Sequence, residues 1–327
     1  MYNMRTSDEL LKMVNDYIED ATITRQPTSL YDPIKYVLSI GGKRIRPVLL
    51  LLTYNMYRDD IERVMPTAVG LETYHNYTLL HDDLMDKADM RRGMPTVHRK
   101  WDDNTAILSG DSMLVVAFQR VAQCPAENLQ DILSLFTMTA LEIGEGQQYD
   151  MDFENRMDVT EDEYIEMIRL KTSVLLACAV KMGAIMAGAS DKDAKNLYAF
   201  GEKLGLAFQL QDDLLDVYGD PKVFGKAIGG DITSNKKTYM LINAILRANN
   251  EQREELIKWI TTDNFDKEEK IKAVTKLYNK IGIRQLCEKK INDYFAEALT
   301  YLEKVNVPEE KKTALQRFTD QMMHREN

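Results

Sequence analysis

Two short stretches of the sequence carry aspartates at the same spacing. Residues 82–86 read DDLMD and residues 212–216 read DDLLD, and each stretch follows an apolar segment typical of a helix. The first and last aspartate of each stretch would stand one turn apart on the same face. Like charges at this spacing destabilise a helix by about 0.2–0.5 kcal/mol, and the dipole at a helix C-terminus adds to the penalty. A bound cation would reverse the sign, and an all-oxygen ligand set suits Mg²⁺ shared with phosphates.

A solvated acidic helix end would explain one such stretch equally well. Two copies, far apart in the chain and each after an apolar segment, favour a pair of metal sites instead.

Basic residues stand close to both acidic stretches, although the formal charge of the chain is −10. Residues 41–47, GGKRIRP, place three cations after two glycines at the predicted start of a helix, where backbone N–H groups favour an anion. Arg91 and Arg92 follow the first acidic stretch, and residues 224–226 (FGK) and 235–238 (NKKT) follow the second. Phosphate groups would use both kinds of residue, with Arg and Lys on one side and carboxylate-held Mg²⁺ on the other.

Some of these cations have simpler explanations. Arg91 and Arg92 could be an exposed loop pair. Lys171, which lies among apolar residues of a predicted helix, could extend its ammonium group to solvent.

The elements that position these residues are predicted to be helices. The 327 residues include only 16 Gly and 8 Pro, both below their usual shares, and no useful alternating strand pattern is present. We expect one all-helical domain over residues 1–327, beginning with a helix capped by Ser7. Further helices are expected at about 67–85, 126–148, 160–187, 195–217, 239–249, 251–262, 267–303 and 309–325. In the last four, acids and lysines alternate on presumed outer faces.

Composition excludes several classes of protein. The acidic charge argues against nucleic acid as the main partner. Cys124, Cys178 and Cys287 lie too far apart for a disulfide framework or a cysteine metal site, and unpaired thiols fit a reducing compartment. No signal peptide is visible, and no run reaches the roughly 18 apolar residues of a transmembrane segment. These features predict a soluble cytoplasmic protein.

Taken in order along nearly the whole chain, these residues resemble the trans-prenyltransferase (polyprenyl diphosphate synthase) family, which includes geranylgeranyl and farnesyl diphosphate synthases. The blocks that carry the resemblance are GGKRIRP at 41–47, His75, DDLMD at 82–86, RRGMPT at 91–96, GEGQQYD at 144–150, Lys171-Thr172, FQLQDDLLD at 208–216, FGK at 224–226, and GGDI with NKKT at 229–238. So many blocks in order are far more specific than a lone DDxxD.

The resemblance implies an all-α isoprenoid-synthase fold with helices around a central cavity, both DDxxD stretches facing that cavity, and a homodimer. It implies head-to-tail condensation of isopentenyl diphosphate with an allylic diphosphate, with Mg²⁺ as cofactor and three ions per site. The catalytic residues that it implies are Asp82, Asp83, Asp86, Lys171, Thr172, Gln209, Asp212 and Lys226.

The resemblance also divides these residues, and several others, by ligand. The implied metal ligands are Asp82, Asp86, Asp212 and Asp216. The implied allylic diphosphate site contains Arg91, Lys171, Lys226 and Lys236, with Lys237 as an alternative to its neighbour. The implied isopentenyl diphosphate site contains Lys43, Arg46, His75 and Arg92. Thr172 and Gln209 would lie near the developing carbocation.

Product length is expected to depend on Tyr77. It lies five residues before Asp82, which is about 7.5 Å deeper along a helix, so its ring would form a floor for the growing chain. Thr78 is small, so it would not add a second bulky side chain to that floor. The resemblance then favours geranylgeranyl over farnesyl diphosphate. A Tyr77 that merely packs in the core, and a longer polyprenyl product, remain alternatives.

Three other functions fit part of the pattern. A terpene cyclase would share the first DDxxD, but the second DDxxD and residues 41–47 argue against it. A metal-dependent phosphohydrolase could use His81 beside Asp82, although the chain contains only four His. A non-catalytic partner subunit would be expected to have lost its acidic stretches, and both are intact here.

Overall fold

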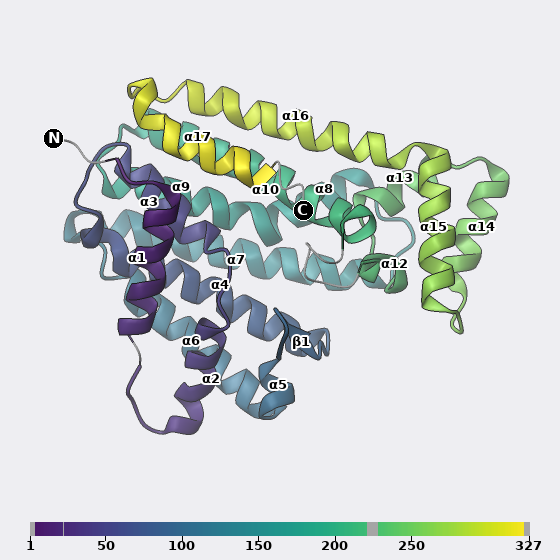
Figure 1. Cartoon of the computed structure of the whole chain (residues 1–327), viewed down its shortest axis with the longest axis horizontal. Coiled ribbons are helices and arrows are strands. Elements are labelled where there is room, and N and C mark those ends of the chain that lie inside the picture. The colour runs from purple at the N-terminus through teal and green to yellow at the C-terminus, as the bar shows by residue number, and fades with distance from the viewer. Residues whose placement is uncertain (1–3, 22, 221–227, 324–327) are drawn as a thin grey trace. The chain divides into compact units, whose positions relative to one another are not determined.

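The computed structural model describes residues 4–21, 23–220 and 228–323. Helices make up most of this part, and within it the only strands are β1 (Met90–Arg91) and β2 (Met94–Pro95), an antiparallel pair (Figure 1). The turn between them has positive φ at Arg92 (52°) and Gly93 (75°), which is the geometry that tightly links two strands. The all-α prediction is confirmed.

The chain divides into two compact units, each assembled from three separate stretches. The first unit comprises Met1–Met138, Cys178–Tyr198 and Lys304–Phe318, and the second comprises Thr139–Ala177, Ala199–Glu303 and Thr319–Asn327. The expectation of one domain over residues 1–327 stays a prediction.

The first unit is built around α4 and α6, which pack along each other and are joined by α2 and α3. Its elements are α1 (Ser7–Asp20), α2 (Thr28–Ser39), α3 (Ile45–Asn55), η1 (Ile61–Val64), α4 (Met65–Met85), β1, β2, α5 (Val97–Lys100), α6 (Asp103–Val121) and η2 (Ala126–Asn128). Buried apolar side chains from α2, α4, α5 and α6 form one core cluster: Ile34, Val37, Leu38, Leu80, Val97, Ala106 and Met113. Burial of this cluster fixes the end of α4, where the first acidic stretch lies.

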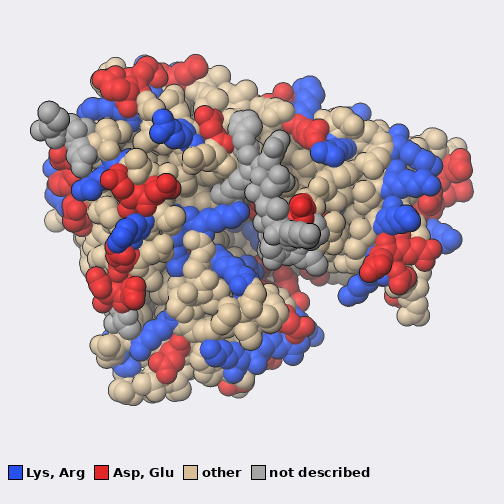
Figure 2. All heavy atoms as spheres, viewed as in Figure 1, with Lys and Arg blue, Asp and Glu red and all other residues tan. Residues whose placement is uncertain are grey.

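The second unit contains the remaining helices that lie wholly within one unit. They are α8 (Glu161–Ile168), the π-helical turn η3 (Arg169–Ser173), α12 (Gly230–Thr233), α13 (Tyr239–Arg247), α14 (Asn250–Thr261), α15 (Lys267–Ile281) and α16 (Ile283–Glu303). Four helices contribute residues to both units: α7 (Leu129–Glu154), α9 (Val174–Met186), α10 (Asp191–Tyr218) and α17 (Glu309–Met323). Charged side chains of both signs lie close together over α14 and α15, at the right of Figure 2.

Two predicted boundaries were wrong for local reasons, and a third predicted helix contains a turn that was not predicted. The first helix is capped by Thr6 rather than Ser7, because Thr6 and Glu9 form a capping box. The predicted helix over 267–303 is two helices, since Gly282 adopts a left-handed φ of 82° and ends α15. The predicted helix over 160–187 is confirmed: it starts with the expected Thr160–Glu163 capping box and continues through the π-helical turn η3 into α9.

Two predicted absences can be compared with the structure. Cys124, Cys178 and Cys287 are buried and free of disulfides. Among the helices in the described ranges, none combines the length and apolar character that crossing a membrane requires.

Candidate active site

The first acidic stretch lies at the C-terminal end of α4. The backbone N–H of Asp86 donates to the carbonyl of Asp82 at 2.9 Å, so the two carboxylates are one turn apart as predicted. Asp83 between them is buried and accepts two hydrogen bonds from Arg91, at 2.6 Å from Nε and 2.7 Å from Nη2. Burial raises the pKa of Asp83, although Arg91 opposes the shift. Asp83 therefore anchors the β1–β2 hairpin to α4.

A dense group of cations surrounds His75 on α4. Part of the His75 surface stays exposed, yet burial and the charges of Arg46, Arg92, Arg91 and Arg44 lower its pKa well below the usual value. The imidazole is therefore neutral at pH 7 and can exchange hydrogen bonds without adding to the positive charge. Such an excess of cations around a neutral histidine favours an anionic ligand with several oxygens.

The loop before α3 meets the β1–β2 hairpin at the same place. The Arg92 guanidinium donates to the carbonyl of Gly41 and lies directly over Gly42. A Cβ built on Gly42 would stand 2.6 Å from Arg92 Nη1, and Gly42 has a φ of 142°, so only glycine fits here. This contact joins two predicted phosphate-binding segments, one carrying Lys43 and Arg46 and the other Arg92.

Arg44 on this loop has a different role from its neighbours Lys43 and Arg46. Its side chain is 2% exposed and pairs with the equally buried Glu72 at 2.8 Å. It also donates to the Leu38 carbonyl at 2.6 Å and to Asn15 Oδ1 at 3.2 Å. Asn76 donates to the same Glu72 oxygen at 3.0 Å. The sequence grouped Arg44 with the anion-binding cations, but the structure buries it under the loop.

The second acidic stretch lies near the C-terminal end of α10, as predicted. Asp212 and Asp216 are half-buried on α10, and Asp216 Oδ2 accepts the backbone N–H of Asp231 at 2.9 Å. Asp213 is buried, and its carboxylate accepts hydrogen bonds from the Tyr164 hydroxyl and from Gln209 Nε2, the latter at 2.9 Å. The middle aspartate of both stretches is thus buried and accepts hydrogen bonds from neighbouring side chains.

The turn η3 carries Lys171 and Thr172 into the same unit. Lys171 Nζ donates to Asp150 at 2.6 Å and its side chain is only 24% exposed, so it does not extend to bulk solvent. Thr172 donates to Gln209 Oε1 at 2.9 Å. A Cβ on Gly146 of α7 would lie 2.3 Å from the backbone nitrogen of Lys171, so glycine allows the two backbones to approach this closely.

Lys236 and Lys237 are distinguished by their contacts. Lys236 Nζ lies 3.9 Å from Asp150 Oδ2, whereas Lys237 Nζ donates to the carbonyl of Glu154 at 3.0 Å. Burial alone would raise the pKa of Asp150, but Lys236 and Lys171 outweigh it and hold the pKa below the usual value.

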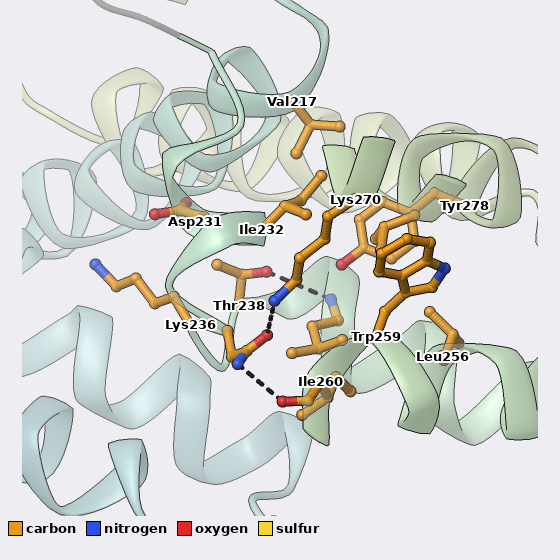
Figure 3. Close-up of a pocket in the computed structure, with 13 residues that line it drawn as sticks. Val217, Asp231, Ile232, Lys236, Thr238, Leu256, Trp259, Ile260, Lys270 and Tyr278 are labelled. Carbon is orange, nitrogen blue, oxygen red and sulfur yellow. Dashed lines mark hydrogen bonds between the residues drawn. The ribbon is translucent and has the colours of Figure 1, made fainter. Parts of the chain in front are cut away.

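Asp231 lies close enough to Lys236 and Asp150 to interact with their charges. Burial and the nearby Asp213 raise the pKa of Asp231, and Lys236 opposes this shift. Figure 3 shows Asp231 and Lys236 on the same side of their loop. Asp150 and Asp231 were missed as site residues, although GEGQQYD and GGDI contained them; their spacing alone shows no chemistry.

Three further predicted residues have simple outcomes. Lys226 falls outside the described residues. Tyr77 is half-buried, with its ring 5.6 Å from that of Tyr74 and 4.9 Å from that of His81, and it packs against the core cluster. Thr78 donates to the backbone carbonyl of His75 at 2.8 Å.

The donor set near the acidic stretches is made of carboxylates. Within the described ranges, no three or more His, Cys, Asp or Glu side chains converge as a closed metal site. An ion held by one or two of these carboxylates would complete its shell with water and phosphate oxygens, which is the usual coordination of Mg²⁺.

Comparison with known proteins places these features in one family. The polyprenyl synthetase family matches residues 27–278. A geranylgeranyl diphosphate synthase from Methanosarcina mazei is 38% identical over 322 residues, covering 96% of this chain and 95% of the relative. A crystal structure of a geranylgeranyl pyrophosphate synthase superimposes with a TM-score of 0.94 at 42% identity, covering 99% of this chain and 100% of its own.

A second solved structure, from Corynebacterium glutamicum, is a geranylgeranyl pyrophosphate synthase in complex with isoprenyl diphosphate and magnesium. It has a TM-score of 0.88 at 27% identity and covers 98% of this chain and 100% of its own. The predicted fold class and the predicted family are therefore confirmed. This chain belongs to the polyprenyl synthetase family and is a prenyltransferase.

Proposed function

We propose that this enzyme condenses isopentenyl diphosphate with an allylic diphosphate, head to tail, and that its product is geranylgeranyl diphosphate. The observation that carries the proposal is the cation cluster around His75 on the helix that ends in DDLMD. Arg46, Arg91 and Arg92 all lie within electrostatic reach of His75, and Arg91 also pairs with Asp83 of the acidic stretch. The names of the relatives support the proposed product.

Mg²⁺ is the proposed cofactor, with three ions per site. Asp82, Asp86, Asp212 and Asp216 would hold the ions, because each is a hard oxygen donor that keeps contact with solvent. The magnesium in the Corynebacterium glutamicum structure supports the choice of ion. When bound, the ions would neutralise charge on the departing diphosphate.

The cations divide into two proposed phosphate sites. Lys43, Arg46, His75 and Arg92 would hold isopentenyl diphosphate. Lys171, Lys236, Arg91 and Lys226 would hold the allylic diphosphate. In the first site, neutral His75 would donate one hydrogen bond to a phosphate oxygen while the cations supply the charge. Holding both diphosphates in fixed positions would bring the two reacting carbons together, which lowers the barrier to forming the new carbon–carbon bond.

Thr172 and Gln209 would stabilise the allylic carbocation. Gln209 uses Nε2 to donate to Asp213 and Oε1 to accept from Thr172, so its amide is held in one orientation. An oriented carbonyl dipole can stabilise positive charge without attacking it. Asp83 would act by holding the Arg91 guanidinium, and Asp213 by holding the Tyr164 hydroxyl and the Gln209 amide.

The chain-length and assembly proposals rest on α4 and α6. Tyr77 would form the floor below Asp82, with Thr78 leaving space beside it. Leu108 and Val115 of α6 are 60% and 58% exposed, one heptad apart on the same helix. Exposed apolar residues at this spacing suit a packing partner, and we propose that a second copy of the chain covers them as a homodimer.

One incubation tests the reaction. Purified protein is given labelled isopentenyl diphosphate, Mg²⁺ and, in separate reactions, dimethylallyl, geranyl or farnesyl diphosphate, and the dephosphorylated products are separated by chromatography. We expect a C20 product. Asp82→Ala should reduce turnover by orders of magnitude while circular dichroism shows an unchanged fold. Release of phosphate without isopentenyl diphosphate, and no longer prenyl chain, would instead indicate a phosphohydrolase.

A further inference from the structure

Lys270 on α15 is a buried lysine that the proposed reaction does not use. The residue is 1% exposed, although it belongs to a helix whose acids and lysines were predicted to face outward. Its ammonium donates to Asn235 Oδ1 at 2.6 Å and lies 4.0 Å from the centroid of the Phe265 ring. Removing an ammonium group from water costs several kcal/mol unless its contacts compensate. A methionine would fill the same space without this cost.

The partner of Lys270 is held from both sides. Asn235 Nδ2 donates to the carbonyl of Ile260 on α14 at 3.0 Å, while Oδ1 accepts from Lys270. Dashed lines in Figure 3 mark both hydrogen bonds. Asn235 has a φ of 56°, a left-handed conformation that asparagine tolerates better than most residues. Two helices therefore fix one side chain at a strained point of the loop.

The fixed residue directly precedes Lys236. The backbone N–H of Lys236 donates to the Asp231 carbonyl at 3.0 Å, and its carbonyl accepts from Thr238 at 2.9 Å. In Figure 3 the Lys236 side chain extends away from Lys270 and Tyr278. It ends 3.9 Å from Asp150, the carboxylate that Lys171 also contacts. The left-handed turn at Asn235 thus determines where the Lys236 ammonium lies.

The pocket in Figure 3 is not a ligand site of its own. Lys270, Trp259 and Tyr278 line it, but its enclosed space is about that of one water molecule. The lining residues therefore pack against the loop that carries Asn235 and Lys236 and hold its conformation.

We propose that Lys270 is a positioning residue for diphosphate binding, acting through Asn235 to hold Lys236 beside Asp150. The inference rests on the proposed function, because it assigns Lys236 to a diphosphate. Lys270 touches neither substrate nor metal. Lys270 stabilises a single conformation of the loop, so that the backbone of Lys236 is fixed although its side chain is flexible.

The first experiment compares Lys270→Met with Lys272→Met, which removes an exposed lysine from the same helix. Binding of inorganic pyrophosphate in the presence of Mg²⁺ is measured by calorimetry, and KM and kcat are measured with the allylic diphosphate. We expect Lys270→Met to weaken pyrophosphate binding and raise KM by about tenfold, the lower end for loss of an orienting partner. Lys272→Met should match the wild type. Equal behaviour of the two variants would overturn the proposal.

The second experiment asks whether Lys270 acts through Lys236. Lys236→Ala is expected to weaken pyrophosphate binding, and adding Lys270→Met should weaken it no further. Multiplying losses would show that Lys270 has a general structural role instead. If Lys270→Met fails to fold, Asn235→Gly replaces it, because glycine keeps the left-handed turn but loses the amide. That variant should show the same loss, and wild-type affinity would refute the proposal.

Failure of the proposed function has a separate signature. Pyrophosphate binding needs no prenyl product, so a wild-type protein that makes no prenyl diphosphate would refute the reaction while the dependence on Lys270 remains measurable.

Discussion

Glu72→Leu is the substitution with the clearest calculable effect. Arg44 and Glu72 are each 2% exposed and lie 2.8 Å apart, and Glu72 also accepts from Asn76 at 3.0 Å. Leucine removes the carboxylate but leaves the guanidinium buried, with Leu38 and Asn15 as its remaining acceptors. Removing one partner of a buried ion pair costs about 3–5 kcal/mol, because the other charge stays buried without compensation.

This cost is large compared with the free energy of unfolding of a typical protein, about 5–15 kcal/mol. With an unfolding entropy of about 2.1 cal/mol/K per residue, a chain of 327 residues would lose about 4–7 °C in Tm. Urea unfolding and calorimetry measure both quantities. A loss below about 1 kcal/mol would show that water or a rearranged side chain replaces Glu72, and would refute the account of a fixed buried pair.

The double variant Arg44→Met/Glu72→Leu separates stability from function. Apolar replacement of both partners is often neutral or stabilising, so we expect it to recover most of the lost free energy of unfolding. The loop that carries Lys43 would still lose its bonds to Leu38 and Asn15. The KM for isopentenyl diphosphate should therefore be raised in the stable double variant, whereas a wild-type KM would show that the pair serves stability alone.

Three other substitutions test single features of the site. Gly42→Ala should raise the KM for isopentenyl diphosphate, since its Cβ would displace Arg92; steady-state kinetics with each diphosphate varied in turn would detect it. The folded-state pKa of His75 is lowered, so the free energy of unfolding should fall as pH drops below about 6.5, by up to about 1.4 kcal/mol per pH unit. His75→Gln should remove that part of the decline between pH 7.5 and 5.5 in denaturant titrations. Tyr77→Ala should lengthen the products seen by chromatography, and an unchanged distribution would exclude Tyr77 as the floor.

The helical fold and the backbone of the acidic stretches could be predicted from the sequence because both are local. Apolar periodicity and the scarcity of glycine and proline predict helices, and the 3.6-residue period alone places Asp82 and Asp86 on one face. Both acidic stretches lie at helix ends, as predicted. The π-helical turn η3 was not predicted, because it depends on packing against another helix. Gly146 of α7 allows the backbone of Lys171 to approach closely there.

The supporting acids of the site could not be predicted in the same way. Asp150 and Glu72 gain their roles from cations that are distant in sequence, such as Lys171, which lies 21 residues from Asp150, and Asp231 is set apart by burial near Asp213. Composition treats every acid alike, and a surface glutamate on α4 would give the same pattern as buried Glu72. Only packing shows which carboxylates are desolvated and which face water.

Arg44 and Lys270 share one physical logic that explains why buried cations accompany the candidate phosphate sites. A lysine or arginine that must contact phosphate remains largely solvated and loses rotamer entropy on binding. A flexible backbone would add to that loss. Arg44 fixes the loop that carries Lys43 and Arg46. Lys270 fixes the loop that carries Lys236. In each case one buried charge is desolvated. The cost is incurred once, on folding, so the exposed cation meets its ligand already oriented.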